Sequence, residues 1–176
     1  MVFLDESGFS LVPNIRKTWA AKGRTPKLVV AGSWSKISAI SAITVSPKRG
    51  RLGLCARFHI GKDIRTQQVE QFLRLLHRHL RGLVFLLWDR SPIHRAKRIG
   101  RFLESHPRIK TFHFPGYAPG LNPDEFIWAN LKRDLANSVP GDLKHLRRLL
   151  ARPRGKLRNS QKLLRSCIHA SDLSWP

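Results

Sequence analysis

The sequence predicts an α/β fold in which a mixed β-sheet carries helices on its faces. Residues 27–60 hold short stretches rich in Val, Ile, Ser and Thr with a turn between them, which is typical of hairpin strands. Residues 66–136 alternate between helical stripes of apolar residues and short continuous apolar runs, which is typical of buried parallel strands joined by helices. Sequential strands followed by such strand–helix units predict a mixed sheet.

Four strands are predicted in the first 60 residues. The apolar run 1–4 is the first, and it ends at Asp5. Residues 10–26 contain two prolines and a glycine, so we expect a loop there, with Trp19 as its anchor. The remaining three strands are expected over residues 27–34, 37–45 and 51–60, with a turn at 47–50.

The next segment is predicted to form two helix–strand pairs. Apolar residues recur at helical spacing over residues 66–80, and the run 83–88 is apolar throughout, as expected for a buried strand that ends before Asp89. A helix over 93–104 and a strand over 109–114 complete the pattern.

A helix over residues 122–136 has a clear start signal. Asn122 is placed as the N-cap, Pro123 occupies the first helical position and Glu125 the third. Pro140 and Gly141 end this region. Beyond them, residues 142–165 carry nine Lys or Arg and one acid on a helical stripe of leucines. We therefore predict a catalytic domain over residues 1–140 and a basic helical extension over residues 141–176.

The charge of the chain predicts a polyanionic partner. The sequence holds 33 Lys and Arg against 11 Asp and Glu, a formal net charge of +22 over 176 residues. A compact fold with this charge repels itself unless a polyanion lies nearby, and each phosphate contact with nucleic acid also releases condensed counterions. Hydrophobic residues make up 41% of the chain, which excludes a disordered basic tail. A merely basic protein of the ribosomal type remains the alternative.

Compartment and processing signals are few. No apolar run approaches the roughly 18 residues of a membrane span, and the first residues lack the features of a signal peptide. Cys55 and Cys167 lie far apart, so we expect two reduced thiols in a cytoplasmic, nucleoid-associated protein. Because a core strand is predicted from residue 1, we also expect a preceding domain that this chain does not contain.

The acidic residues are concentrated in three short motifs. Five of the 11 acids are Asp5, Glu6, Asp89, Asp124 and Glu125. Carboxylates kept together in so basic a chain suit a hard divalent cation such as Mg²⁺, which prefers oxygen ligands. Two such ions can activate an attacking oxygen and stabilise a leaving oxygen in phosphoryl chemistry.

Each acidic motif also has a purely structural interpretation. Asp5 begins the segment Asp-Glu-Ser-Gly, which favours a turn, and Asp89 is in a position to cap the next helix. Glu125 has the strongest alternative, a capping box in which its side chain reaches back to the amide of Asn122. Asp124 complements the helix dipole. Trp128 is expected in the core.

Several residues near these motifs are candidates for contact with nucleic acid. Arg90 and His94 follow Asp89 closely, although His94 is equally well explained as an ordinary surface histidine. The basic stripe beyond residue 142 is either a solvated helix face or a phosphate-binding surface, and at this net charge we favour the second. The full set of predicted nucleic-acid-binding residues is Arg90, His94, Arg95, Lys132, Lys144, Arg147 and Arg148.

Three motifs in order carry a family resemblance. They are FLDESGF at residues 3–9, LWDRSPIHRA at 87–96 and FPGYAPGLNPDEFIW at 114–128, followed by Leu131-Lys132. Over residues 1–135 the chain resembles the catalytic domain of the Tc/mariner superfamily of DDE transposases, in particular its bacterial insertion-sequence (IS-six-thirty type) branch. The third motif is the most specific of the three.

The resemblance implies an RNase H-like fold with a mixed five-stranded sheet and helices on both faces. It maps the catalytic, metal-binding triad onto Asp5, Asp89 and Glu125, with 35 residues between the last two. It further implies two Mg²⁺ or Mn²⁺ ions, cleavage of DNA at the element ends, strand transfer into target DNA and a possible homodimer. The upstream helix-turn-helix domain of the family is missing, and Arg90 stands where the family often has Asn. Two alternatives stay open: a structure-specific RNase H-like nuclease, and a catalytically inactive DNA-binding remnant of a decayed element.

Overall fold

The computed structural model describes residues 1–30 and 35–174 and contains a five-stranded sheet in the order β3-β2-β1-β4-β5. The strands are β1 (Val2–Ser10), β2 (Lys36–Val45), β3 (Leu52–Ile60), β4 (Val84–Trp88) and β5 (Ile109–His113). The first three strands pair antiparallel, whereas β4 runs parallel to both β1 and β5. The mixed five-stranded sheet expected from the sequence is confirmed.

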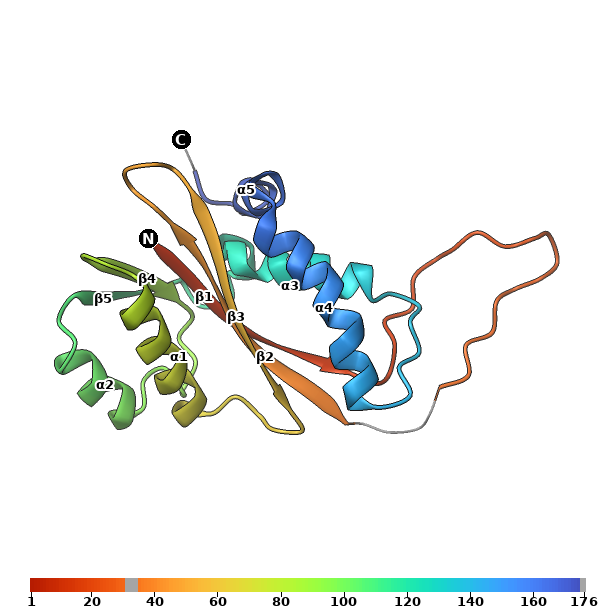
Figure 1. Ribbon diagram of the computed structural model, residues 1–176, viewed down its shortest axis with the longest axis horizontal. Coiled ribbons are helices and arrows are strands. Elements are labelled where there is room, and N and C mark those ends of the chain that lie inside the picture. Colours follow the sequence, from red (N-terminus) through yellow and green to blue (C-terminus); the bar gives the residue numbers. More distant parts are fainter. Residues whose placement is uncertain (31–34, 175–176) are drawn as a thin grey trace.

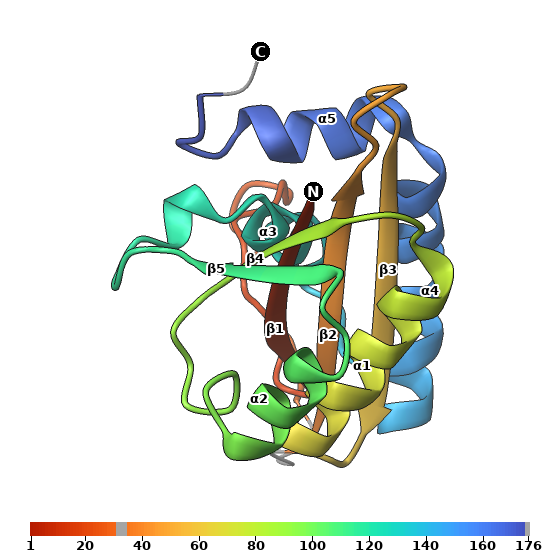
Figure 2. The same ribbon diagram turned by 90° about the vertical axis from the view of Figure 1, so that its left-hand side faces the viewer.

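Helices cover both faces of this sheet (Figures 1 and 2). The helices α1 (Thr66–His79) and α2 (Lys97–Glu104) pack on one face, which we call the α1 face. The other face, the α3 face, carries α3 (Pro123–Asp134), α4 (Leu143–Asn159) and α5 (Gln161–His169). A short 3₁₀ helix (Pro119–Leu121) leads into α3. None of the helices in the described part of the chain has the length and apolar character that a membrane crossing requires.

Two predicted strand boundaries are wrong. The first strand does not end at Leu4 but continues to Ser10, because its second half pairs with β2 in an unbroken register from Val2↔Thr44 to Ser10↔Lys36. Residues 27–30, predicted as the start of a strand, have no regular structure, and the rest of that prediction, 31–34, lies outside the described residues. The β-branched residues that favoured a strand at this place do not outweigh the lack of a partner strand.

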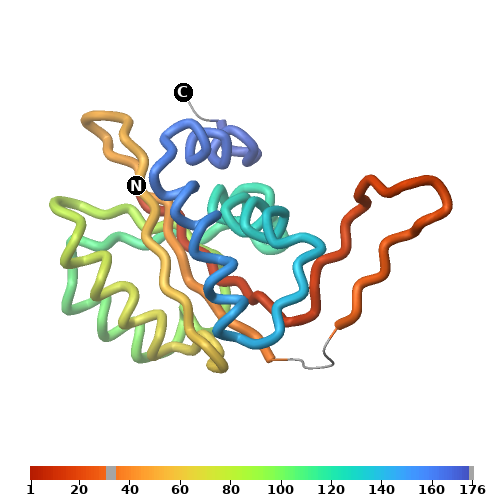
Figure 3. The backbone as a smooth tube through the Cα atoms, turned by 45° about the vertical axis from the view of Figure 1, so that its right-hand side comes forward, coloured from red at the N-terminus to blue at the C-terminus, as the bar shows by residue number. Residues whose placement is uncertain are grey.

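Residues 11–30 form an arm that projects away from the sheet (Figures 1 and 3). Its base is fixed to the end of α3, because the Asn137 side chain accepts a hydrogen bond from the Arg16 amide at 2.9 Å and donates one to the Arg16 carbonyl at 3.0 Å. Trp19 was expected to anchor this loop, but its side chain is 99% exposed. That expectation is wrong, because the anchor is a pair of polar contacts.

The second predicted helix begins later than the sequence indicates. We expected it from Ile93, whereas α2 begins at Lys97. Residues 92–94 form a turn instead, held by a hydrogen bond from the His94 amide to the Ser91 carbonyl at 3.0 Å. This turn directs the His94 ring back toward the sheet.

The C-terminal helices belong to the same hydrophobic core as the sheet. Leucines of α4 and α5, including Leu146, Leu150 and Leu164, pack in one buried group with Ile43 of β2 and Trp128 of α3. The Lys and Arg residues of these helices are exposed. The boundary between residues 140 and 141 stays a prediction.

Candidate active site

Asp5 and Asp89 are brought together by the parallel pairing of β1 and β4. The register joins Val2 to Leu86 and Phe3 to Leu87, so two further residues along each chain lead to Asp5 and Asp89. The paired ladder stops before that point. There the side-chain amide of Asn122 donates a hydrogen bond to the Leu4 carbonyl at 3.0 Å, which fixes the start of α3 beside the same place.

Asp5 lies inside β1 and not at its end, which corrects the interpretation of Asp5 as a strand-end or turn residue. Its side chain is on the α3 face opposite Ser41, its antiparallel partner in β2. The indole Nε1 of Trp128 donates a hydrogen bond to Asp5 Oδ2 at 2.9 Å. Trp128 is fully buried, as predicted, and its polar edge holds a carboxylate.

The electrostatic environment of Asp5 disfavours its charged form. The pKa of Asp5 is raised from 3.8 to about 8, mainly by burial and also by the nearby carboxylates of Glu125 and Glu6, against the opposing hydrogen bonds from the Glu6 backbone and Trp128. Such a carboxyl is stabilised in its charged form only when a cation lies close to it. The ionisable side chains that act on Asp5 are Glu125 and Glu6, and both carry carboxylate oxygens, the ligand type that Mg²⁺ and Mn²⁺ accept.

Asp89 follows β4, and its carboxylate is 55% exposed. Its Oδ1 accepts a hydrogen bond from the Ser91 amide at 2.9 Å and lies 2.8 Å from Nδ1 of His94. The bond to Ser91 closes a local turn of the Asx kind. Asp89 is therefore not a helix cap, because α2 begins eight residues later with Ala96 as its N-cap.

His94 is buried between two carboxylates, with 1% of its side chain exposed. Nε2 lies 3.0 Å from Glu6 Oε1, Nδ1 faces Asp89, and the ring stacks on Trp88 at a centroid distance of 4.3 Å. Burial by itself lowers the pKa of His94, but the hydrogen bond and charge of Glu6, with those of Asp89, outweigh burial and raise the pKa overall. Both ring nitrogens are occupied and the side chain is buried, so His94 is not a surface histidine. Its contact with nucleic acid stays a prediction.

Glu125 lies at the third position of α3 and is half-buried. The capping-box alternative is not what the structure shows, because the Asn122 amide donates to the Pro119 carbonyl and the Asn122 side chain caps the helix by accepting from the Asp124 amide at 3.1 Å. Burial raises the pKa of Glu125, the Lys132 ammonium lowers it and the Asp89 carboxylate raises it. Glu125 is thus near enough to Asp5 and to Asp89 for its charge to interact with each of theirs.

Asp124 also belongs to this site, although the family resemblance does not include it in the triad. Asp124 is fully buried, and Ser41 Oγ donates a hydrogen bond to its Oδ2 at 2.5 Å, while Oδ1 has no partner among the described residues. Burial raises the pKa of Asp124 well above its ordinary value. The expected role of Asp124 at the helix dipole does not account for its buried contact with Ser41. The signal that could have identified its partner is Ser41, a polar residue on the face of β2 that otherwise presents Ile37, Ala39 and Ile43.

The carboxylates converge without forming a preassembled metal cage. Within residues 1–30 and 35–174, no group of three or more His, Cys, Asp or Glu side chains is arranged so that it could hold a metal ion. Asp89 is the residue turned away, because His94 and Ser91 hold its Oδ1.

The other predicted nucleic-acid-binding residues occupy two regions. Arg90 and Arg95 are exposed in the segment between β4 and α2. Lys132 lies seven residues, or about two helical turns, beyond Glu125 on α3. Lys144, Arg147 and Arg148 are exposed on α4. Their contact with nucleic acid stays a prediction.

A comparison with protein families agrees with this arrangement of acidic residues on the sheet. The family described as DDE superfamily endonuclease matches residues 1–147. The chain belongs to this family. The predicted enzyme class, a DDE-type endonuclease, is thereby confirmed at family level. No match was found among curated proteins.

Solved structures similar to this DDE family member include several of Mos1 mariner transposase. The Mos1 paired-end complex with Mn matches with a TM-score of 0.64 and 18% identity over 99% of this chain and 56% of that chain. The Mos1 strand transfer complex matches with a TM-score of 0.62 and 17% identity over 99% and 55%. The isolated Mos1 catalytic domain gives 0.56 and 15% over 98% and 83%. The RNase H-like fold is thus confirmed, and the chain spans just over half the length of the proteins in the complexes.

Proposed function

We propose that the chain is the catalytic domain of a DNA transposase of the Tc/mariner superfamily, from its bacterial insertion-sequence (IS-six-thirty type) branch. It hydrolyses phosphodiester bonds at element ends and transfers the freed strand into target DNA. The observation that carries the proposal is that Asp5, Asp89 and Glu125 come from three different elements beside β1, with Glu125 near enough to each of the other two for their charges to interact. Family membership and the Mos1 fold support it.

The three carboxylates are proposed to hold two Mg²⁺ or Mn²⁺ ions. Mos1 structures are described with Mn and with Mg, which supports this choice. When bound, the ions would activate the attacking oxygen and stabilise the leaving oxygen of an in-line displacement. The repulsion that raises the pKa of Asp5 is relieved by a cation, so the donor set fits such ions.

The protein residues around the triad have separate tasks in this proposal. Trp128 fixes the Asp5 carboxylate through its indole N–H. His94 holds Asp89 from the side of the α1 face and would orient it, as partners of metal ligands commonly do. Lys132 favours the ionised form of Glu125. Arg90 and Arg95, together with Lys144, Arg147 and Arg148 of α4, would bind the phosphates of the DNA.

The wider assembly is proposed on the same basis. DNA is the proposed partner, since the similar structures are transposase complexes with transposon ends. An upstream helix-turn-helix domain would recognise those ends, and a homodimer would pair them. Residues 1–140 form the proposed catalytic domain, and residues 141–176 the proposed basic extension. The proposed location of the protein is the nucleoid in the cytoplasm.

Metal binding and cleavage test the proposal together. We would measure Mn²⁺ binding by electron paramagnetic resonance and Mn²⁺-dependent nicking of a supercoiled plasmid, comparing the chain with Asp89→Asn. Losing a metal ligand removes several kcal/mol of charge stabilisation, so nicking falls on the order of 10³-fold. Glu104→Gln, an exposed acid of α2, is the matched control and leaves both unchanged.

Other outcomes support the alternatives. Undiminished metal-dependent cleavage by Asp89→Asn rules out the assigned triad. Degradation of RNA–DNA hybrids without action on duplex DNA indicates a structure-specific nuclease. DNA binding with a salt slope of about −0.9 per phosphate contact but no metal dependence indicates a non-catalytic remnant.

A further inference from the structure

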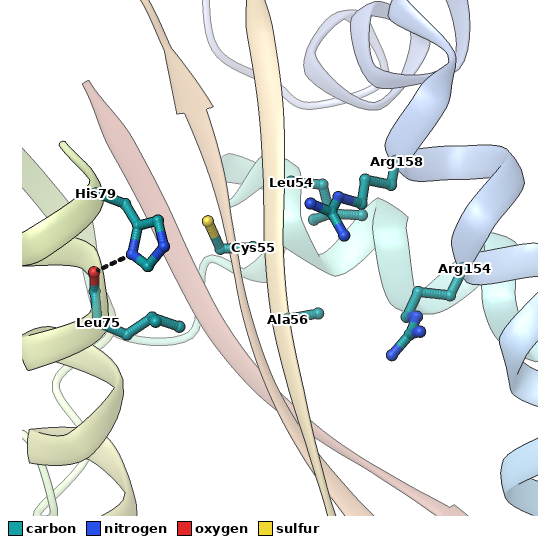
Figure 4. Close-up of a pocket in the computed structure, with 7 residues that line it drawn as sticks. All are labelled: Leu54, Cys55, Ala56, Leu75, His79, Arg154 and Arg158. Carbon is teal, nitrogen blue, oxygen red and sulfur yellow. Dashed lines mark hydrogen bonds between the residues drawn. The ribbon is translucent and has the colours of Figure 1, made fainter.

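A groove runs along the free edge of the sheet at β3, away from the carboxylates (Figure 4). Its floor is the strand segment 54–56, and its volume is about 220 Å³. Leu75 and His79 of α1 form one wall, on the side toward which Cys55 points. Arg154 and Arg158 of α4 form the other wall and point toward the strand.

The floor offers backbone hydrogen-bonding groups that no described residue uses. In an antiparallel strand, the N–H and C=O of one residue point to the same side, and the side alternates along the chain. Both groups of Leu52 bond outward to the Gln161 side chain, at 2.9 and 2.7 Å. The same groups of Leu54 and Ala56 therefore also face outward, into the groove.

The α4 wall is positively charged and unpaired. Neither Arg154 nor Arg158 makes a salt bridge with any described residue, although the Arg154 guanidinium lies 5.5 Å from the centre of the Phe58 ring. Helix α4 has no acidic residue. An anionic group at this wall would meet two guanidiniums without competition from a carboxylate of the same helix.

The spacing of these two arginines matches that of a β-strand. Residues four apart on a helix are about 6 Å apart along its axis, and alternate residues of a strand are about 6.6–6.8 Å apart. The side chains of Leu54 and Ala56 face α4, so residues paired with them in an added strand would also point toward Arg158 and Arg154. The residue between them would face Leu75 and Cys55.

We propose that the β3 edge groove binds an extended peptide segment of a partner protein, with acidic residues at two alternate positions and an apolar residue between them. The segment adds to the sheet as a sixth strand, bonded to the backbone of Leu54 and Ala56, with its carboxylates on Arg154 and Arg158. The partner is a separate polypeptide region, because these 176 residues contain no two acids separated by a single position. This mode of recognition combines backbone pairing with side-chain specificity.

A peptide fits this groove better than a nucleic-acid strand does. The outward carbonyls of Leu54 and Ala56 accept hydrogen bonds from a peptide backbone, whereas a phosphate has no proton to donate to them and would be repelled. The α1 wall also offers the apolar surface of Leu75, and His79 is turned onto its own helix by a hydrogen bond to the Leu75 carbonyl at 2.8 Å.

The test is a titration of the ¹⁵N-labelled chain with a blocked peptide of sequence Thr-Glu-Val-Glu-Thr, followed by amide chemical shifts. We expect the amides of Leu54 and Ala56 to shift and to become protected from hydrogen exchange. The double variant Arg154→Glu/Arg158→Glu should weaken binding at least tenfold. The matched control Arg152→Glu/Lys156→Glu has the same helix, spacing and charge change, and should retain more than half of the affinity.

Three results overturn the proposal. The first is equal binding by a peptide with Lys in place of Glu, or by one with N-methylated glutamates. The second is an equal loss in both double variants, which indicates unspecific charge attraction. The third is a short DNA duplex that protects the two amides when the peptide does not, which assigns the groove to nucleic acid. Melting curves of both variants show whether each is folded.

Discussion

Two polar groups of side chains lie on opposite faces of the same strand, β1, and they handle charge differently. On the α3 face, Asp5 and Asp124 accept hydrogen bonds from Trp128 and Ser41, and the charges that act on them are those of other carboxylates. On the α1 face, Glu6 and Asp89 share the buried imidazole of His94. Successive side chains of a strand point to opposite faces. The neighbouring acids Asp5 and Glu6 therefore lie in different sites, and of the two only Glu6 has a partner among the described residues that can carry positive charge.

Both groups bind protons more tightly when the chain is folded, but for opposite reasons. Burial and neighbouring carboxylates disfavour the charge of Asp5, so its pKa rises. Carboxylates favour the charge of His94 against the effect of burial, so its pKa also rises. A divalent cation can replace the proton at the first group, whereas the second already has its cation. Of these two groups, the one on the α3 face lacks a positively charged partner among the described residues and is therefore the one suited to bind a cation.

The largest effect is expected from Asp5→Asn. With a pKa near 8 in the folded chain and 3.8 as its ordinary value, Asp5 binds more protons when folded, so stability falls as the pH rises from about 4 to 8. Each pKa unit is worth about 1.4 kcal/mol, so the contribution is several kcal/mol across this window. The variant should flatten the pH dependence of the unfolding free energy measured by urea denaturation. An unchanged slope contradicts the assignment.

The next largest effect is expected from His94→Phe, which keeps the ring stacked on Trp88 but leaves Glu6 and Asp89 without their cation. Breaking a buried pair by removing one partner costs about 3 kcal/mol. Because the folded-state pKa of His94 is raised, its contribution is complete below its unfolded pKa and is lost as the pH rises through the folded value. The penalty should therefore be largest at pH 5 and smaller at pH 9 in thermal melts. A penalty that grows with pH would refute the ion pair.

A smaller effect is expected from Trp128→Phe. The aromatic ring remains in the core, but Asp5 Oδ2 loses its indole donor. A hydrogen bond to a charged group is worth about 1.5–3 kcal/mol, so Mn²⁺ binding should weaken roughly tenfold through loss of the ionised, oriented carboxylate. The measurement is Mn²⁺ titration at pH 7, with Phe126→Leu as a control at a half-buried position of the same helix. Equal weakening in both variants would indicate a packing effect.

The smallest effect is expected from Asp124→Asn. The amide keeps the shape of the side chain and a hydrogen bond with Ser41, and it removes a buried carboxyl whose charged form is disfavoured. Stability at pH 7 should change by less than about 1 kcal/mol, whereas Asp124→Ala should cost about 2 kcal/mol because it orphans the buried Ser41 hydroxyl and leaves a cavity. Urea denaturation distinguishes the two. Equal losses would show that the carboxylate charge itself is needed.

Much of the fold could be predicted because it depends on local patterns. The apolar run that forms β4 and the start of α3 at Asn122 are encoded within a few residues. The strand predicted at 27–30 fails because a strand also needs a partner, which a local pattern does not contain. The predicted start of α2 at Ile93 is wrong because residues 92–94 form a turn, held by the His94 amide and the Ser91 carbonyl, and the helix begins only at Lys97.

By itself, the sequence determined the class of fold, the basic surface and the three acidic motifs in their order, since these depend on composition and short-range periodicity. Only the tertiary structure decided which acids are paired. Asp5 and Glu6 are adjacent in the chain, yet Asp5 meets Trp128 and Glu6 meets His94. The physical reason is that ionisation depends on burial and on polar and charged groups within a few ångströms. These neighbours are distant in the chain: His94 lies 88 positions from Glu6, and Trp128 lies 123 positions from Asp5.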